Sequence, residues 1–372
     1  MSAKRSMKTI LILSLLAAAM CILLKTSGNV YAASSVKLSR SRLTVFVSDK
    51  QTLKVKGTSK KVTWSSSNEK VAKVSAKGKV RALKPGKATI TAKVGKKRLK
   101  CKVTVYETIG TYYCLWNVNW NLSPSGRKLT EAEAAEVRRA VNLLIDRSYI
   151  AKSIVGEGRK PAVGLVARGI MEPDGGQFYK HSGPKNAGYY PVKAKKAAAM
   201  KILKKYYSVS GGKVTNFPEI DYIYNKEGAA HAAIASYIQS RLKRAGIKMN
   251  IKSYAWDDYL TELKKGHFTL ARSGWAADVN DAINFLELYV KSNPDNYCRL
   301  GRGKHASESV YSVKLKGIGN YKNLKGTWKQ TYQKLITYIK KEKKAKNRNR
   351  LLHKAEDQLM ETGCICPLYY YT

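Results

Sequence analysis

The chain has 372 residues, 44% of them hydrophobic, and a formal net charge of +45 at pH 7. This length accommodates two folded domains and a processed segment, and the hydrophobic fraction supports a buried core, which excludes a wholly disordered chain. The cations are scattered along the sequence without an RNP, zinc-finger or helix-turn-helix signature, so a dedicated nucleic-acid reader is disfavoured.

The first 32 residues have the form of a Sec signal peptide. Three cations precede the apolar run 10–24, Lys25 closes the run, and small residues lead to an expected cleavage near Ala32. The run is short for a bilayer, which favours cleavage over an uncleaved membrane anchor. Cys21 lies inside the run rather than at its end, which argues against lipidation. With no other long apolar stretch, we expect a secreted, soluble protein at the cell surface or cell wall.

Loss of this segment lowers the net charge only from +45 to +41, because the segment carries four cations and no acidic residue. The polyanions that an exported protein meets are cell-wall polymers, anionic lipid head groups and extracellular nucleic acid. Because the lysines are spread over both expected domains, the pattern predicts a solvated basic surface that adheres non-specifically, with no specific nucleic-acid partner.

The cysteines and histidines suggest neither a metal centre nor catalysis. There is no CxxC spacing and there are no clustered histidines, so we expect neither a zinc site nor a disulfide framework, and no metal or cofactor. On a strand, Cys364 and Cys366 would point to one face, as small buried thiols. Without a nucleophile elbow or a P-loop, the sequence does not indicate an enzyme. The cysteines after the signal peptide are Cys101, Cys114, Cys298, Cys364 and Cys366.

Residues 35–106 alternate between short strands and turns. Segments such as LTVFV, QTLKVKG and ATITAKV alternate apolar and polar residues, with turn residues about every eight to twelve positions. The pattern predicts an antiparallel all-β sandwich in which Trp64 fills the centre, while Lys77-Gly78 and Pro85-Gly86 supply turns.

Within this region the segment VTWSSSNEKVAKVSAKGKVRALKPGKATITAKV resembles the bacterial Ig-like group 2 family. The resemblance implies an immunoglobulin-like (Ig-like) sandwich, a module of surface adhesins and secreted Gram-positive proteins that often acts as a spacer. No residue of this domain stands out as a catalytic or ligand-binding group, so a spacer or wall-proximal role is favoured over a specific ligand site.

Residues 109–372 change to alternating helices and strands. Thr130-Glu131-Ala132-Glu133 forms a capping box that predicts a helix through Asp146, and Pro191 predicts the start of a second helix through Tyr207. A strand at 220–224, a helix from Glu227 to Gly246 and a strand at 249–254 have the lengths of a parallel crossover unit.

Further elements follow the crossover. We expect a short helix at 256–265, a strand at 268–272 and two helices within the charged stretch 327–361. Alternation of this kind predicts the α/β class for the second domain, so the whole chain is multidomain, an all-β sandwich followed by an α/β domain.

Three segments of the second domain resemble solute-binding protein family 5, the extracellular peptide-binding components of ABC importers. They span most of the domain in the family's order, and IGTYYCLWNVN before them resembles the strand entering from the hinge. The resemblance implies an α/β lobe of the periplasmic-binding-protein type II fold. The segments read EVRRAVNLLIDRSYIAKSIVGEGRKPAVGLV, then IDYIYNKEGAAHAAIASYIQSRLKRAGIKMNIKSYAWDDYLTELKKGHFTLARSGWAADVNDAINFL, then LLHKAEDQLMETGCICPLYYY.

The same resemblance implies a set of ligand-binding residues. In peptide-binding members the aspartate of a Gly-Trp-x-Ala-Asp element pairs with the peptide amine, and here that aspartate is Asp278. Trp275 of the element would form a pocket wall, and Trp256 matches a further pocket tryptophan. Arg272 and His231 match positions linked in some relatives to the ligand carboxylate.

Each of these residues also has a structural interpretation. The two tryptophans could be core aromatics, His231 a residue at a helix start with a satisfied ring, and Asp278 the cap of a helix from Asn280. The match of the whole surrounding motif favours the binding role for Asp278, whereas the two interpretations of His231 are balanced.

The resemblance also departs from the family in extent. Complete members close two lobes around the ligand, and here the first lobe is expected to be missing, with the Ig-like domain in its place. Since closure supplies much of the desolvation, we expect peptide binding that is weak or needs a partner, in service of an ABC permease complex. The alternative is a basic surface module that adheres to anionic cell-wall polymers and keeps the lobe as a scaffold.

Overall fold

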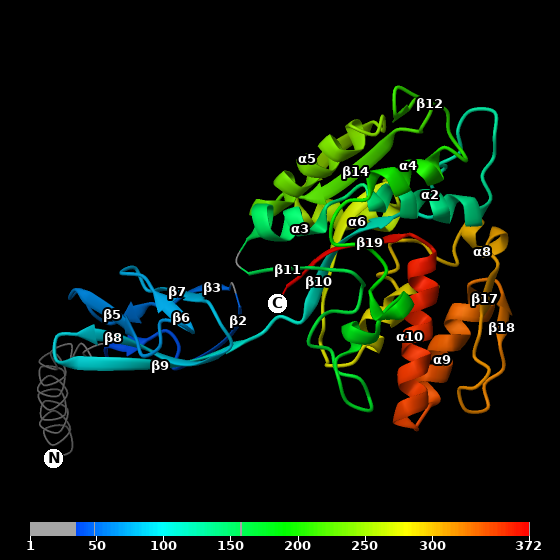
Figure 1. Cartoon of the computed structure of the whole chain (residues 1–372). Helices are drawn as coiled ribbons and strands as arrows, with labels where there is room; N and C mark the ends of the chain where they lie inside the picture. The colour runs from blue at the N-terminus through cyan, green and yellow to red at the C-terminus, as the bar shows by residue number, and fades with distance from the viewer. Residues whose placement is uncertain (1–34, 48, 157, 372) are drawn as a thin grey trace, which may run out of the picture. The chain divides into compact units, whose positions relative to one another are not determined.

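A computed structural model describes residues 35–47, 49–156 and 158–371, and the expected signal peptide lies outside the described residues. The chain divides into two compact units, residues 1–107 and 108–372, whose elements are labelled in Figure 1. Among the described residues, no helix combines the length and apolar character needed to cross a membrane.

The described part of the first unit contains strands only. A four-stranded sheet has the order β2-β9-β8-β5 and a three-stranded sheet the order β3-β7-β6. The strands are β1 (Lys37–Leu38), β2 (Arg42–Phe46), β3 (Lys50–Thr52), β4 (Val55–Lys56), β5 (Val62–Ser66), β6 (Ala72–Val74), β7 (Lys79–Ala82), β8 (Gly86–Val94) and β9 (Lys97–Tyr106).

The two sheets share one hydrophobic core, built from the inward residues of their alternating strands. Small aliphatic side chains such as Ile90 and Val103 fill it, while Trp64 is only partly buried and packs against its margin. The expectation that Trp64 fills the centre is therefore wrong. The reason is positional, since β5, which carries Trp64, is an edge strand of its sheet.

The second unit is built on a six-stranded mixed sheet of order β11-β19-β10-β16-β14-β15. Its strands are β10 (Gly110–Trp116), β11 (Lys160–Pro161), β14 (Ile220–Asn225), β15 (Met249–Tyr254), β16 (Leu270–Ala276) and β19 (Ile365–Tyr370). Short hairpins pair β12 (Val209–Ser210) with β13 (Lys213–Val214), and β17 (Tyr311–Val313) with β18 (Leu324–Gly326).

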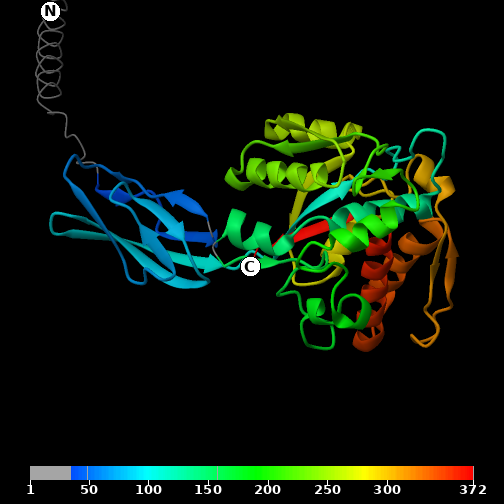
Figure 2. The same ribbon diagram turned by 45° about the horizontal axis from the view of Figure 1, so that its top comes forward.

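Helices pack around this sheet, and α9 and α10 lie side by side in both views of the molecule (Figures 1 and 2). The longer ones are α2 (Glu131–Leu143), α4 (Lys196–Leu203), α5 (Ala229–Lys243), α6 (Trp256–Lys265), α9 (Lys334–Lys341) and α10 (Ala345–Glu361). Short helical segments are α3 (Arg147–Tyr149), η1 (Ile150–Val155), η2 (Phe178–His181), η3 (Pro184–Asn186), α7 (Ile283–Leu286), η4 (Glu287–Tyr289), α8 (Lys304–Glu308) and η5 (Lys329–Gln333).

Most local predictions for this unit are confirmed. The side chain of Thr130 accepts from the Glu133 amide, and the Thr130 amide donates in return to the Glu133 carboxylate, which completes the capping box of α2. Strands β14 and β15 are parallel and joined by α5, as a crossover requires. The predicted strand at 268–272 is found as β16, which runs on to Ala276.

The predicted helix start at Pro191 is wrong, because α4 begins only at Lys196. The preceding segment remains non-helical because its backbone bonds elsewhere. The carbonyl of Val192 accepts from the amide of Ser148 at 2.9 Å, and the amide of Lys195 donates to the carbonyl of Leu143 at 2.8 Å. These tertiary hydrogen bonds outweigh the preference of proline for a first helical turn.

Candidate functional site

Arg272 lies in the middle of β16 with its guanidinium packed among tyrosines from three other elements. Its Cζ atom lies 4.9 Å from the ring centroid of Tyr112 on β10, and Tyr259 of α6 donates to its backbone carbonyl. Its Nε atom is buried without a hydrogen-bond partner, and within the described chain no carboxylate pairs with it. A buried cationic group with an unused donor is poised for an anionic ligand.

A pocket of about 280 Å³ opens beside this arginine. Trp256 at the start of α6 is 45% exposed and forms one wall, and Trp275 on β16 contributes to the lining. The structure thus brings together three of the five residues that the resemblance implies. The exposure of Trp256 argues against its interpretation as a core aromatic.

His231 lies close to the same arginine but is held by the backbone. Its Nδ1 atom is 2.9 Å from the carbonyl of Asn225, so Nδ1 carries the proton and Nε2 is the variable atom. The ring centroid lies 5.6 Å from that of Tyr112, which also contacts Arg272. Burial, reinforced by repulsion from Arg272, lowers the pKa of His231. The histidine is therefore neutral at neutral pH in the free protein.

Asp278 follows β16 on an exposed turn and does not line the pocket. Its interpretation as a helix cap is wrong, because α7 begins at Ile283 and the Ile283 amide bonds to Asp281 instead. No described residue bonds to the Asp278 carboxylate. Asn284 orients this turn, accepting from the Trp275 indole at 2.8 Å and from the Asp278 amide at 3.2 Å.

Gly274 of the Gly-Trp-x-Ala-Asp element has a steric explanation. A Cβ atom at this position would lie 2.0 Å from the hydroxyl of Tyr371, whose ring also crosses Gly110 on β10. Only a residue without a side chain admits this approach. Tyr371 in turn lies near Arg272 and contributes to its electrostatic environment.

Sequence reasoning missed Tyr112, Tyr371 and Asn284 at this site. The two tyrosines come from β10 and from the segment after β19, and they meet Arg272 because β10 neighbours β16 in the sheet and β19 is the next strand beyond β10. The signal available was the alternation of IGTYYCLW, which places Tyr112 and Cys114 on one face of the strand.

Two histidines that are scattered in the sequence come together with a glutamate in the structure. Glu172, His181 and His353 bring their ligand atoms to within 4.8 Å of one another. Burial opposes ionisation of Glu172, but hydrogen bonds from the two histidines and from Asn349 outweigh it and hold the pKa of Glu172 below its usual value. Burial lowers the pKa of His353. Separately, Cys364 and Cys366 are buried thiols, as predicted.

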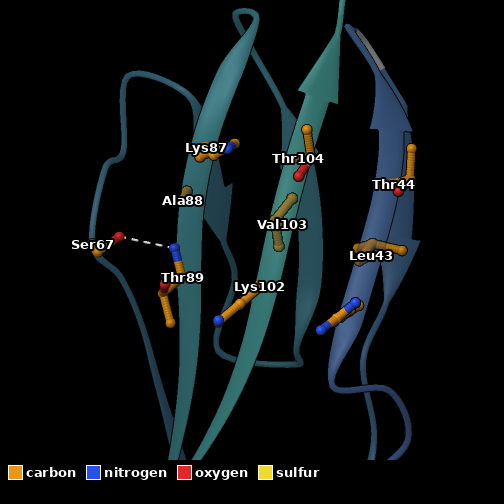
Figure 3. A pocket seen from close by; sticks show the side chains of 10 residues that line it. Leu43, Thr44, Ser67, Lys87, Ala88, Thr89, Lys102, Val103 and Thr104 are labelled. Atoms are coloured by element: carbon orange, nitrogen blue, oxygen red, sulfur yellow. Dashed lines mark hydrogen bonds between the residues drawn. The ribbon is translucent and has the colours of Figure 1, made fainter.

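The first unit carries a hollow of about 630 Å³ on its four-stranded sheet. Figure 3 shows Lys87 and Lys102 beside threonines of β2, β8 and β9, with the Ser67 side chain accepting from the Thr89 amide at 2.8 Å. Strands β2, β5, β8 and β9 contain no acidic residue. Six exposed cations stand on the outer face of this sheet, namely Arg42, Lys87, Lys93, Arg98, Lys100 and Lys102.

The mixed sheet, its crossover helices and the pocket beside β16 define the second unit as an α/β lobe of the binding-protein class. A model of the bacterial extracellular solute-binding proteins, family 5 Middle, matches residues 46–297, which is more than half of the chain. The chain belongs to this family.

Curated relatives agree with this assignment. The dipeptide-binding protein DppE of Bacillus subtilis (strain 168) is 26% identical over 273 residues, covering 72% of this chain and 41% of that protein. The periplasmic oligopeptide-binding protein OppA of Salmonella typhimurium is 24% identical over 282 residues, covering 74% of this chain and 42% of that protein. The chain therefore spans about two fifths of the length of these relatives.

Solved structures share the fold. The Escherichia coli murein tripeptide binding protein MppA matches with a TM-score of 0.51 and 21% identity, covering 71% of this chain and 43% of that one. A peptide-binding protein of a peptide ABC transporter matches with a TM-score of 0.52 and 19% identity over 71% of this chain. That match covers 99% of the solved chain, so a lobe of this extent accounts for nearly all of that structure.

Proposed function

We propose that residues 108–372 bind short peptides at the Arg272 pocket, as an extracellular solute-binding component for uptake by an ABC importer. The observation that carries the proposal is Arg272, a residue that lines the pocket and whose buried Nε atom has no hydrogen-bond partner. Relatives named for dipeptide and oligopeptide binding support peptides as the ligand class.

The proposed roles follow from the geometry around the pocket. Arg272, assisted by His231 across the Tyr112 ring, receives the peptide carboxylate through charge-assisted hydrogen bonds. Trp256 and Trp275 provide apolar walls that accept varied side chains. The exposed carboxylate of Asp278 pairs with the α-ammonium group.

Calorimetry and thermal unfolding with a mixed library of short peptides test this function. The pocket is open, so we expect binding by this chain alone on the order of millimolar, and tighter binding when a second protein surface covers the ligand. Binding heat and a rise in unfolding temperature that both saturate with peptide concentration support the proposal. Absence of both at about millimolar peptide, with and without the permease complex, would refute it.

A prediction concerns pH. Peptide binding places a carboxylate beside His231, whose pKa is lowered in the free protein, so binding takes up a proton at Nε2. Affinity is expected to rise as pH falls from about 8 to about 6, by at most about tenfold per unit.

His231→Gln should flatten this profile, whereas His267→Gln, at an exposed histidine paired with Glu262, should preserve it. Both variants are measured by calorimetry with the same peptide. The titration of the peptide's own termini therefore contributes equally to both pH profiles and does not affect their difference. Equal profiles for both variants would show that His231 does not contact the carboxylate.

We further propose that residues 1–32 are a cleaved signal peptide and that residues 35–106 form a bacterial Ig-like group 2 domain ahead of the solute-binding domain at 109–372. The two sheets packed on one core support the Ig-like assignment. A secreted, surface-associated location fits these parts, with the Ig-like domain as a spacer.

A second candidate function is adhesion to anionic cell-wall polymers through the cationic sheet face. Two cross-strand pairs there join like charges, Lys93 opposite Arg98 and Arg42 opposite Lys102. Like charges directly opposite each other destabilise a sheet, and a bound polyanion would relieve the repulsion. This local arrangement favours a binding face over a uniformly basic surface.

The matching prediction uses two double variants of equal charge. Arg98→Thr with Lys102→Thr is expected to raise the unfolding temperature and to weaken salt-sensitive retention on purified cell wall by at least about tenfold. Lys73→Thr with Lys79→Thr, on the three-stranded sheet, should retain binding. If both double variants lost the same amount of cell-wall binding, net charge alone would explain the result. If binding to the cell wall did not depend on salt, electrostatic adhesion would be excluded.

A further inference from the structure

The cluster of Glu172, His181 and His353 joins two distant parts of the second unit. Glu172 Oε1 lies 2.6 Å from His181 Nδ1 and 3.1 Å from His353 Nε2. Glu172 and His181 belong to the segment that includes η2, whereas His353 lies on α10. Glu172 is close to fully buried, with 3% of its side chain exposed.

Local structure fixes the orientation of each group. The backbone of Glu172 donates to the carbonyl of Gly176 at 3.2 Å, closing a tight loop, and Gly176 adopts a φ of +90°. A Cβ atom on this glycine would reach 3.5 Å from Glu172 Oε2. The ring of His353 stacks on Phe178 with centroids 4.0 Å apart. The cluster is therefore built by the fold and not by chance contacts of flexible side chains.

A second observation beside the cluster indicates a polar ligand there. Asn349 lies one turn before His353 on α10, beside Glu172. It is 92% buried, yet its Oδ1 atom has no hydrogen-bond donor, while its amide nitrogen donates to Asp174 at 3.0 Å. An orphaned carbonyl oxygen at this place is suited to accept from a water bound to an ion in the cluster.

The donor set has the chemistry of a transition-metal site. Two imidazole nitrogens and one carboxylate oxygen are ligands of Zn²⁺ at about 2.0–2.2 Å, which gives ligand-to-ligand distances of roughly 3.3 Å in a tetrahedron. The observed 2.6 and 3.1 Å fall near that value, and the three ligand atoms all lie within 4.8 Å of one another, so an ion enters by small movements of the two imidazole rings. On binding, the proton on each facing nitrogen moves to the other nitrogen of its ring.

We propose that Glu172, His181 and His353 bind one divalent ion of the Zn²⁺ class, with a water as fourth ligand hydrogen-bonded to Asn349. The ion would tie the loop at 171–181 to α10. The amide of Met171, next to Glu172, bonds to Asn280 at 2.7 Å, so the site also lies close to the turn that carries Asp278.

The test uses the full chain, stripped with a chelator, and two probes. Titration with Zn²⁺ by calorimetry is expected to show one equivalent and to raise the unfolding temperature of the second unit. Co²⁺ in place of zinc is expected to give the visible absorption of a tetrahedral nitrogen and oxygen site. Glu172→Gln, His181→Gln and His353→Gln should each weaken binding by at least about 100-fold.

His267→Gln provides the matched control, because His267 Nδ1 lies 3.2 Å from Glu262 Oε2 in an exposed pair outside the cluster. It should bind zinc as the wild type does. Circular dichroism identifies any variant that fails to fold, and the double variant His181→Gln with His353→Gln supplies a second comparison. Undetectable zinc binding by the wild type at about 100 µM, or equal affinity in the double variant, would overturn the proposal.

Discussion

Arg272→Met is expected to lower peptide affinity by about 100-fold, the loss associated with truncating one partner of a buried charge pair. The same change should leave the unfolding temperature of the free protein equal or higher. Burying the unpaired Nε of Arg272 costs about 1–3 kcal/mol, which a thioether of similar length avoids. Loss of the cation–π contact with Tyr112 offsets part of this gain.

If Arg272 binds the ligand, its replacement lowers peptide affinity without lowering the unfolding temperature. If Arg272 is structural, the replacement lowers the unfolding temperature instead. Calorimetry with a peptide and a thermal scan of the free protein measure the two quantities. Arg244→Met, at an exposed position after α5, should change neither. A fall of several degrees in unfolding temperature with unchanged affinity would assign Arg272 a structural role and remove the basis of the proposed site.

Arg138→Met is expected to destabilise the second unit by about 3–5 kcal/mol. The fully buried guanidinium of Arg138 pairs with Glu131 and donates to the carbonyl of Thr362 at 2.9 Å, linking α2 to the end of α10. Its removal leaves the largely buried carboxylate of Glu131 without its partner. Chemical denaturation of the variant measures the loss.

Two further variants isolate the ion pair. Adding Glu131→Gln to Arg138→Met should restore much of the stability, because the uncompensated charge is gone. Arg139→Met, one residue along the same helix, removes an arginine that bonds to the carbonyl of Glu361 at the surface, and should cost less than about 1 kcal/mol. Equal losses at both arginines would contradict the argument from burial.

Local rules predicted the elements whose determinants are adjacent in sequence. The capping box at Thr130 and Glu133, the crossover from β14 to β15 and the bounds of α6 all rest on contacts within a few residues or on simple periodicity. Those rules failed where tertiary contacts decided the structure. After Pro191, backbone hydrogen bonds to Leu143 of α2 and Ser148 of α3 replaced the helix, and Trp64 lies on an edge strand.

The candidate site was predictable only where a motif matched a family. Arg272, Trp275 and Trp256 meet at one pocket, and His231 lies beside Arg272 across Tyr112. Their partners Tyr112 and Tyr371 are 160 and 99 residues away from Arg272 in the chain, and sheet order alone brings them together. Likewise, no sequence pattern predicts that Glu172 and His353 lie close together, because their contact depends on how α10 packs against the loop at 171–181.

Carboxylate recognition by Arg272 is tested by calorimetry on the intact chain, comparing one tripeptide as a free acid with the same tripeptide as its C-terminal amide. If Arg272 reads the carboxylate, amidation lowers affinity by about 100-fold in the wild type and has little effect on Arg272→Met. Equal binding of the acid and the amide by the wild type would contradict peptide recognition at this pocket.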